Sequence, residues 1–348
     1  MNERSYPAVF MRGGDASGLF FHLRDIPDEG AQRDHLLIKA MGSPDPYGMQ
    51  VDGLGKGTTS TSKCVMVSKS IEPGCDIDYL FAQVLVDRPE VDWKRSCGNL
   101  AAATALFAVE EGLVPTSQDG QYSFVMNQVN RGEIIRASVD ANTKKVRLSF
   151  ENKKSNISPI LGPLPTFELL LPEVGMIELS IIEATNTFAF VRSVSIETES
   201  MRNGDFLSLK KRVDALQEQI AKELSIGGHP LKARVLLVDP PVSYTDQGGE
   251  LVKANSMDLF LRAISGHGIH HAIPMTAVMA ASVGALIPGT IIAAALQTSI
   301  KGNSVRVGHP SGVATASAQV SKSSTGSHFL SADIELSARR IMSGEIFI

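Results

Sequence analysis

The pattern of hydrophobic and polar positions predicts a chain of many short strands and few helices. Apolar runs typical of strands occupy residues 8–11, 19–21, 64–68, 77–86, 123–127, 133–139 and 145–150. Residues 98–111 differ, because small and apolar side chains fall on nearly every side of the helix they would form. Such a helix must be buried, so we expect a curved sheet wrapped around it.

The second half of the chain has a similar pattern. Strands are predicted at residues 177–184, 187–191, 233–238 and 258–263, and a second apolar helix at residues 274–286. Residues 205–224 form the clearest amphipathic helix, whose apolar stripe we expect to pack on its own domain. A further helix is expected at residues 31–41. The mixture of strands and helices indicates an α+β fold.

A chain of 348 residues is longer than one hydrophobic core usually serves. We therefore expect two domains. The strands before and after Asn186 mark the changeover, which gives an N-terminal domain at residues 1–185 and a C-terminal domain at residues 186–348. The proline-rich connector at residues 158–165 is the most irregular stretch, but it need not be the boundary.

Composition and charge exclude several classes of protein. A formal net charge of −4 provides no basic surface for nucleic acid, so an anionic ligand must be held by local donors. Three irregularly spaced cysteines suit neither a disulfide framework nor a cysteine metal site, and a cytoplasmic location fits them. The uncharged run at residues 272–300 is broken by Pro288 and Gly289, so we expect a buried helix, a turn and a second apolar segment rather than a membrane span.

Lys63 and Cys97 are the candidate proton-transfer residues. Lys63 stands at the entry to a strand, where loss of solvent favours the neutral amine that acts as a base. Cys97 precedes the apolar helix, whose dipole favours a thiolate and whose first N–H groups favour an anion. Taken alone, an exposed lysine and a small buried cysteine are the simpler interpretations.

Other polar residues near the two predicted helix starts are candidates for binding a ligand. The N–H groups of Gly98 and Asn99 begin the first helix, and Ser62 precedes Lys63. His270 and His271 precede the second helix, and His271 is the candidate to line a cleft. No carboxylate accompanies these histidines at ligand spacing, so no metal is expected. His309 and Ser311 offer further donors, although a solvent-exposed turn explains them equally well.

Several short motifs then occur in one order along almost the whole chain. They are Met11-Arg12-Gly13-Gly14, Gly42-Ser43-Pro44-Asp45, Val51-Asp52-Gly53, Thr61-Ser62-Lys63, Asp78-Tyr79-Leu80, Cys97-Gly98-Asn99, His270-His271-Ala272, Ile287-Pro288-Gly289-Thr290 and Gly308-His309-Pro310-Ser311-Gly312. By these motifs the chain resembles the 2-methylaconitate isomerase (PrpF-like) family, which is similar in fold to diaminopimelate epimerase and proline racemase.

The resemblance implies two similar domains, each a curved, mostly antiparallel sheet around a central apolar helix, with the active site in the cleft between them. It also implies that Lys63 and Cys97 handle the proton, without a cofactor. One loop departs from the family, because Asp15-Ala16-Ser17-Gly18 stands where relatives usually have Thr-Ser-Lys-Gly. If both side chains face the ligand, Asp15 and Ser17 disfavour a substrate carboxylate there.

The expected function is isomerisation of a small unsaturated di- or tricarboxylate. The candidate acids are 2-methylaconitate, aconitate, methylitaconate and 4-oxalomesaconate, and a homo-oligomer is compatible with this interpretation. One alternative is an amino-acid racemase or epimerase, which normally needs a second cysteine where this chain has His270-His271. The other is a binding protein that has kept the cleft and lost turnover.

Overall fold

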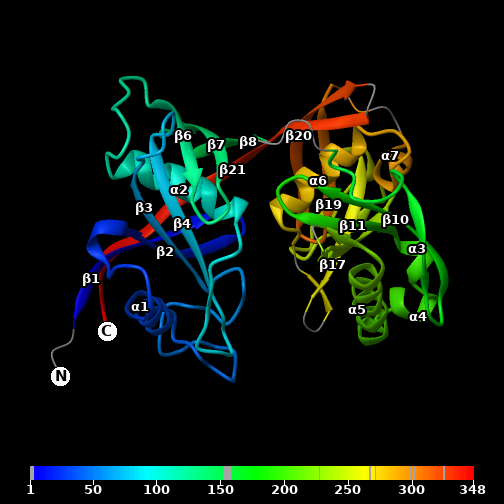
Figure 1. Ribbon diagram of the computed structural model, residues 1–348, viewed down its shortest axis with the longest axis horizontal. Coiled ribbons are helices and arrows are strands. Elements are labelled where there is room, and N and C mark those ends of the chain that lie inside the picture. Colours follow the sequence, from blue (N-terminus) through cyan, green and yellow to red (C-terminus); the bar gives the residue numbers. More distant parts are fainter. Residues whose placement is uncertain are drawn as a thin grey trace. The chain divides into compact units, whose positions relative to one another are not determined.

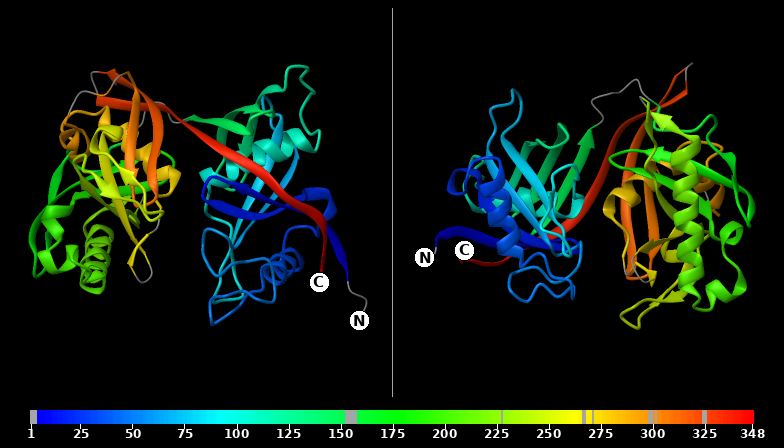
Figure 2. Two further views of the ribbon diagram at one scale, coloured as in Figure 1. Left: turned by 180° about the vertical axis from the view of Figure 1, so that it is seen from behind. Right: turned by 60° about the horizontal axis from the view of Figure 1, so that its bottom comes forward.

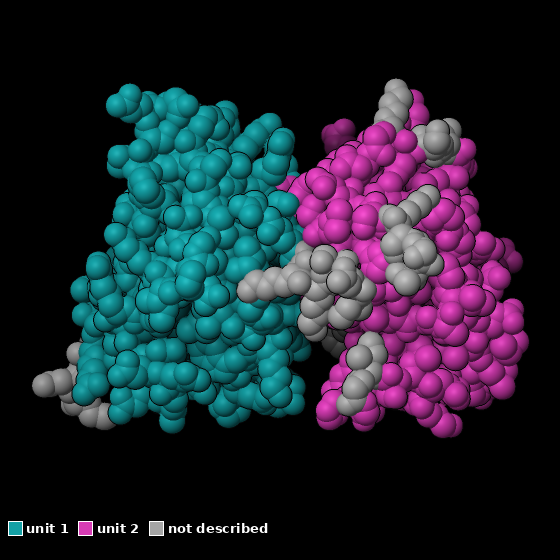
Figure 3. All heavy atoms as spheres, turned by 45° about the horizontal axis from the view of Figure 1, so that its top comes forward, with its two compact units in different colours: residues 1–153, 335–348 teal, residues 154–334 magenta. Residues whose placement is uncertain are grey.

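The computed structural model describes residues 4–151, 158–226, 228–265, 268–270, 272–297, 300, 302–323 and 326–348. The chain divides into two compact units, coloured separately in Figure 3. Unit 1 comprises Met1–Lys153 and Glu335–Ile348, and unit 2 comprises Lys154–Ile334. The boundary expected between residues 185 and 186 lies inside unit 2. Unit 1 takes residues from both ends of the chain, so a single cut in the sequence does not separate the units.

Among its described residues, unit 1 contains eight complete strands, part of a ninth, two α-helices and one 3-10 turn. Its strands are β1 (Ser5–Gly13), β2 (Ala16–His22), β3 (Lys63–Lys69), β4 (Ile77–Val84), β5 (Val91–Asp92), β6 (Gln121–Gln128), β7 (Glu133–Asp140) and β8 (Lys145–Glu151), joined by the last part of β21 (Gly326–Phe347). Its helices are α1 (Ala31–Met41), α2 (Gly98–Glu110) and the 3-10 turn η1 (Leu23–Asp25).

The strand pairings of unit 1 close into a ring in the order β1-β2-β3-β4-β6-β7-β8-β21 and back to β1. Helix α2 packs against β1, β2, β3, β7 and β8 (Figure 1). Its residues from Leu100 to Ala108 are all buried, which is what an all-round apolar sequence requires. Phe107 of this helix lies 5.6 Å from Phe20 of β2, measured between ring centroids.

The strands near Lys63 have two buried faces. Alternate residues, including Cys64 and Met66 on β3 and Ala82 on β4, pack in a cluster with Leu36 and Leu37 of α1. Because side chains alternate along a strand, Lys63 and Val65 lie on the opposite face, which is the face that Phe20 shares with α2. This alternation places Lys63 on the α2 side of the sheet.

Unit 2 has a comparable inventory. Its strands are β9 (Phe167–Leu171), β10 (Gly175–Glu183), β11 (Thr187–Arg192), β12 (Ser225–Ile226), β13 (His229–Pro230), β14 (Arg234–Asp239), β15 (Tyr244–Thr245), β16 (Leu251–Val252), β17 (Leu259–Ser265), β18 (Gly268–Ile269), β19 (Ser304–His309), β20 (Gly312–Ser323) and the first part of β21. Its helices are α3 (Ser193–Ile196), α4 (Glu199–Arg202), α5 (Phe206–Glu223), α6 (Met275–Ala285), α7 (Ile291–Ala295) and the 3-10 turn η2 (Ala254–Ser256).

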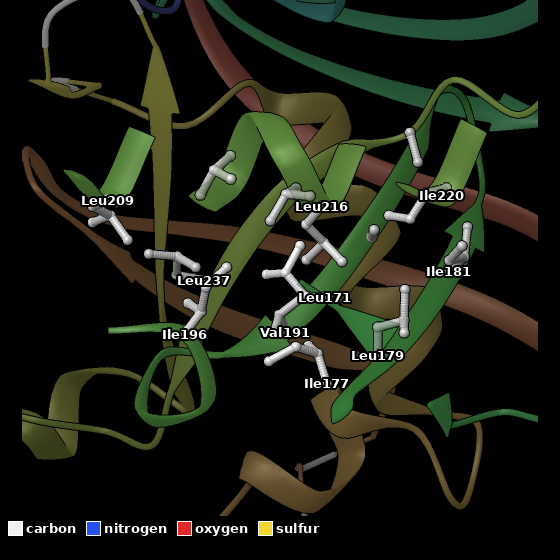
Figure 4. Packing of buried hydrophobic residues seen from close by; sticks show 14 of the residues in the cluster. Leu171, Ile177, Leu179, Ile181, Val191, Ile196, Leu209, Leu216, Ile220 and Leu237 are labelled. Atoms are coloured by element: carbon white, nitrogen blue, oxygen red, sulfur yellow. The ribbon is translucent and has the colours of Figure 1, made fainter. Parts of the chain in front are cut away.

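The main strands of unit 2 pair in the order β9-β10-β11-β14-β17-β19-β20-β21, and β11–β14 and β17–β19 are the parallel pairs. Helix α6 is buried along its whole length and packs against β10, β11, β19 and β20. The apolar stripe of α5 packs as predicted within its own unit. Figure 4 shows Leu209, Leu216 and Ile220 of this helix in one cluster with strand residues such as Leu171 and Leu237.

Strand β21 was not predicted. It pairs with β20 through Ile334 and with β1 from Ala338 to Phe347, and Figure 2 shows its red end beside the blue β1. Its sequence is rich in glycine, serine, alanine and charged residues, and most side chains after Arg339 are exposed. An apolar alternation is therefore absent from the segment that closes the ring of unit 1.

The uncharged run of residues 272–300 contains the buried helix α6, a turn at Pro288 and Gly289, and the short helix α7. This is the arrangement expected from the sequence. In the part of the chain that the structure describes, helices that are both long and apolar enough to cross a membrane are absent.

Candidate functional site

Lys63 is the first residue of β3, between a parallel neighbour, β2, and an antiparallel neighbour, β4. It is only 9% exposed. Gly18 of β2 makes this position possible, because a Cβ atom there would lie 2.5 Å from the Lys63 carbonyl oxygen. The strand pairing therefore fixes the backbone of Lys63 tightly and encloses its side chain.

The contacts of the Lys63 ammonium are with uncharged groups. Its Nζ donates a 2.9 Å hydrogen bond to Oε1 of Gln83, the residue opposite it on β4. The same nitrogen lies 5.0 Å from the centroid of the Phe81 ring. None of the ion pairs among the described residues includes Lys63. One neutral acceptor and one ring face thus hold the end of the Lys63 side chain.

Ser62 is fully buried, and two glutamines hold it. Nε2 of Gln83 donates to the Ser62 carbonyl at 2.8 Å, and Nε2 of Gln50 donates to the Ser62 hydroxyl at 2.8 Å. Gln50 also donates to Ser43 and accepts from the Gly57 N–H, so it ties the loop before β3 together. The hydroxyl of Ser62 is thus engaged inside the protein, and its direct contact with a substrate stays a prediction.

Cys97 is the N-cap residue of α2, with an extended backbone at φ −140° and ψ 102°. Its carbonyl accepts the first hydrogen bond of the helix, from Ala101 at 2.9 Å. The thiol is half-buried and makes no capping hydrogen bond. Cys64 contrasts with it, because complete burial raises the pKa of the Cys64 thiol and keeps it protonated.

Tyr79 is a buried tyrosine on β4, the strand that also carries the two residues in contact with Lys63. Tyr79, Phe81 and Gln83 are alternate residues and therefore share one face of the strand. Burial raises the pKa of Tyr79, and the negative charges that Glu133 and Cys97 can carry raise it further. Lys63 is opposite Gln83 on this face and Cys97 precedes helix α2 in the same unit, and that the two residues share one site stays a prediction.

Glu133 is a mostly buried carboxylate beside Tyr79. Burial raises its pKa, while Arg131, 2.9 Å away, and a hydrogen bond from Ser96 lower it. Its Oε2 has no hydrogen-bond partner among the described residues. Ser96 precedes Cys97, so Glu133 contacts the segment that presents the thiol.

The Gly13-Gly14 turn packs on the first turn of α2. A Cβ on Gly13 would lie 2.1 Å from the Asn99 carbonyl oxygen, and one on Gly14 would lie 2.3 Å from Asn99 Oδ1. Gly14 also has a positive φ of 48°, which glycine adopts readily. Oδ1 of Asn99 is buried without a hydrogen-bond partner in the described part of the chain.

The loop that departs from the family, residues 15–18, exposes one polar side chain and buries another. Asp15 is exposed at the tip of the two-residue turn between β1 and β2. Ser17 is buried on β2, and its N–H donates to the Ser60 carbonyl at 3.2 Å. The turn thus leaves Asp15 open to solvent and encloses Ser17, and contact of either side chain with a ligand stays a prediction.

The remaining candidates belong to unit 2. His309 ends β19 and is buried, and its Nδ1 lies 3.3 Å from the Ser311 N–H, which donates to it. The Tyr244 hydroxyl lies 2.6 Å from the carbonyl oxygens of His309 and Gly312 and so fixes this turn. His271, the candidate to line a cleft, lies outside the described residues. Within the described residues, groups of three or more His, Cys, Asp or Glu that could hold a metal ion are absent.

The sequence interpretation did not single out Gln50, Gln83 or Glu133, and it named Tyr79 only as part of a motif. Gln83 carried a signal, since it is a polar residue on the same face of the strand as Tyr79 and Phe81. Strand register converts that signal into a contact, because it places Gln83 opposite Lys63.

Comparisons with known proteins cover nearly the whole chain. The family model described as "PrpF protein" matches residues 3–158 and 165–348. A 2-methyl-aconitate isomerase of Shewanella oneidensis is 33% identical over 97% of this chain and 95% of the relative. A 2-methyl-aconitate isomerase of Cupriavidus necator is 34% identical over 97% and 96%. A 3-methylitaconate isomerase of Eubacterium barkeri is 28% identical over 100% and 98%.

Solved structures show the same fold. The crystal structure of a methylitaconate-delta-isomerase aligns with a TM-score of 0.79 and 23% identity, covering 100% of this chain and 96% of that chain. A hydroxyproline epimerase from Agrobacterium vitis aligns with a TM-score of 0.63 and 11% identity over 99% and 93%. The fold is therefore that of the isomerases and epimerases of the proline racemase type, as the resemblance in sequence implied.

Proposed function

Because the chain belongs to the PrpF protein family, we propose that it is a cofactor-independent isomerase that moves or isomerises the C=C bond of a small unsaturated di- or tricarboxylate. The observation that supports this function best is the enclosed Lys63, held by Gln83 and Phe81 without an ion pair. A lysine in such a site can give up and regain its proton without separating from a counter-ion.

Lys63 is the base in this proposal. Its neutral amine removes a proton from the carbon next to the double bond, and the electron pair spreads through the double bond onto a carboxylate as a dienolate. The first N–H groups of α2, at Gly98 and Asn99, have no acceptor within the helix and stabilise the developing negative charge. Each unit, in this proposal, is a curved sheet around its central helix, α2 or α6.

Reprotonation completes the reaction. A proton added two carbons from the original position moves the double bond, and rotation in the intermediate changes its geometry. Lys63 returns the proton on the face from which it took it, whereas Cys97 would deliver one from the other face. The proposed donors to the substrate carboxylates are Ser17, Ser62, His271, His309 and Ser311.

The substrate class includes several acids. The two relatives at 33% and 34% identity are named for 2-methylaconitate, which makes this acid or a similar aconitate the first candidate. Relatives at 28% identity are named for 3-methylitaconate and (4E)-oxalomesaconate, and an allylic isomerase of either kind is the second candidate.

The test is NMR of aconitate, 2-methylaconitate, methylitaconate and oxalomesaconate incubated with the protein in deuterated water. We expect one acid to gain deuterium and to change the position or geometry of its double bond. Lys63→Met should abolish both changes, since it removes the base and keeps the length of the side chain. Cys97→Ser should slow turnover if the thiol delivers the proton, and should leave deuterium exchange at the first carbon in place.

Two control variants match these changes. Lys69→Met removes an exposed lysine from the other end of β3, and Cys75→Ser removes a second partly exposed thiol. Both should keep the activity of the unchanged protein. A folded protein that exchanges no proton of any of the four acids would refute the isomerase assignment. Exchange that persists in Lys63→Met would refute the role of the lysine.

A further inference from the structure

We propose that Gln83 is a positioning residue that keeps Lys63 in a neutral hydrogen bond, so that the lysine can exchange its proton. This inference rests on the proposed function, in which Lys63 is the base. Gln83 is 2% exposed, and both ends of its amide are used. Oε1 accepts from Lys63 Nζ at 2.9 Å, and Nε2 donates to the Ser62 carbonyl at 2.8 Å.

These two hydrogen bonds orient the amide. The Ser62 carbonyl only accepts, so it holds the NH₂ group of Gln83 on its side and turns the amide oxygen toward Lys63. The backbone also pairs here, because the Val84 N–H donates to the same carbonyl at 3.1 Å. The position of the acceptor is therefore determined by the β3–β4 pairing, and Lys63 is held whether or not it carries a charge.

The neutrality of Gln83 is the property that matters. A carboxylate at this position would form an ion pair with Lys63 and hold it as the ammonium, which cannot act as a base. The Phe81 ring also attracts the ammonium, but a ring face attracts it less than a buried carboxylate does. A glutamine therefore supplies orientation without the charge that would block proton removal.

Other charged groups near this site are already paired or lie further along the sheet. Asp92 of β5 is opposite Gln83, and its carboxylate accepts from Arg95 Nε at 2.6 Å, which lowers its pKa together with the Lys94 N–H. The partner of Lys63 on the other side, β2, presents Gly18 and Leu19. The first turn of α2 carries no acidic residue, and Cys97 and Glu133 lie beside Tyr79, four residues from Gln83 along β4.

The experiment replaces Gln83 and follows Lys63 directly. Protein labelled with ¹³C at the lysine ε-carbon is titrated by NMR, and the Lys63 signal is assigned by its loss in Lys63→Met. In Gln83→Glu we expect the midpoint of the Lys63 titration to rise by about 1 to 3 pH units, which is the effect of an opposite charge at this distance. The pH at which kcat reaches half its plateau should rise by the same amount.

Gln83→Met keeps the approximate volume and removes the acceptor. It should lower kcat without raising the midpoint, because no negative charge is added. Gln128→Glu is the matched control, since Gln128 is also a fully buried glutamine on a strand of unit 1, bonded to Asn130 and Arg131. It should leave the Lys63 midpoint unchanged, which separates the local charge from the general effect of a buried carboxylate.

The outcomes separate the two proposals. A raised Lys63 midpoint in Gln83→Glu supports the role of Gln83, even if the unchanged protein turns over none of the acids. An unchanged midpoint in a folded Gln83→Glu variant would overturn it, even if the isomerase activity is present. Equal losses of activity in all three glutamine variants at every pH would also overturn it, because they would show a structural role alone.

Discussion

Replacing Gly18 with alanine should displace Lys63, although the change adds one methyl group to the neighbouring strand. The new Cβ would lie 2.5 Å from the Lys63 carbonyl oxygen, 3.1 Å from its carbonyl carbon and 3.2 Å from its Cβ. Ordinary contact begins near 3.4 Å, so the carbon and the oxygen must separate by about 0.9 Å, the difference between 3.4 and 2.5 Å. All three atoms belong to the backbone or its first side-chain carbon, so no side-chain rotation relieves the clash.

Two effects follow from this displacement. Overpacking of a well-filled interior costs about 1 to 3 kcal/mol of folding free energy. A reacting group misplaced by about 1 Å loses on the order of 100-fold in rate, so kcat/KM should fall toward that amount. Urea denaturation measures the first effect, and deuterium exchange into the acid identified above measures the second.

Gly344→Ala is the control, because both positions lie in strands and the backbone of neither requires glycine. The nearest atom to a Cβ on Gly344 is Met342 Cε at 3.7 Å, an ordinary contact. This variant should be within about 0.5 kcal/mol of the unchanged protein and fully active. A Gly18→Ala variant with unchanged stability and unchanged exchange would refute the reasoning that β2 fixes the position of Lys63.

Two further predictions concern buried charge. Burial raises the pKa of Glu133 above its ordinary value of 4.5, so the carboxyl stabilises the folded state below about pH 4.5 and loses this contribution as the pH rises through the raised pKa. As the pH rises from 4.5 to 7.5, the free energy of unfolding of Glu133→Gln should therefore increase relative to that of the unchanged protein. Urea denaturation at the two pH values measures this difference, and a difference that stays constant would contradict the prediction. In unit 2, Arg262 binds both oxygens of Glu197, whose side chain is fully buried, and also Asp239. Arg262→Met should cost about 3 to 5 kcal/mol, because it leaves the buried Glu197 carboxylate with only the more distant Arg202, 3.9 Å away. Arg306→Met, at a pair with Asp258 in which the arginine is 45% exposed, should cost about 1 kcal/mol or less; equal urea midpoints in the two variants would show that the buried pair has no special weight.

The helices were the part of the fold most open to prediction. Residues 31–41 were predicted as a helix, and α1 has those bounds. The apolar composition of α2 and the stripe of α5 identified their burial as well as their position, because a helix brings together residues three and four apart in sequence. Such local patterns do not depend on the rest of the chain.

The contacts of the site were less open to prediction. Lys63 and Gln83 are 20 residues apart, and Gln50 and Ser62 are 12 apart, so their hydrogen bonds depend on strand register and loop conformation. The motifs identified Lys63 and Cys97 as candidates, but no local pattern indicated that the lysine would face a neutral amide. The same limit applies to the end of β21 that lies in unit 1, because its partners β1 and β8 are far away in sequence.

The ring of strands in unit 1 has a consequence for how the protein is made. The ring closes only when residues 338–347 of β21 pair with β1, so the unit that contains Lys63 cannot be completed until the ribosome has finished these residues. Unit 2, at residues 154–334, is synthesised earlier as one continuous segment. A nascent chain therefore carries an open strand edge at β1 throughout the synthesis of unit 2, and an open edge is a template for wrong pairing. Folding of the lysine-bearing unit is thus completed after unit 2 has been synthesised, even though β1 leaves the ribosome before unit 2 does.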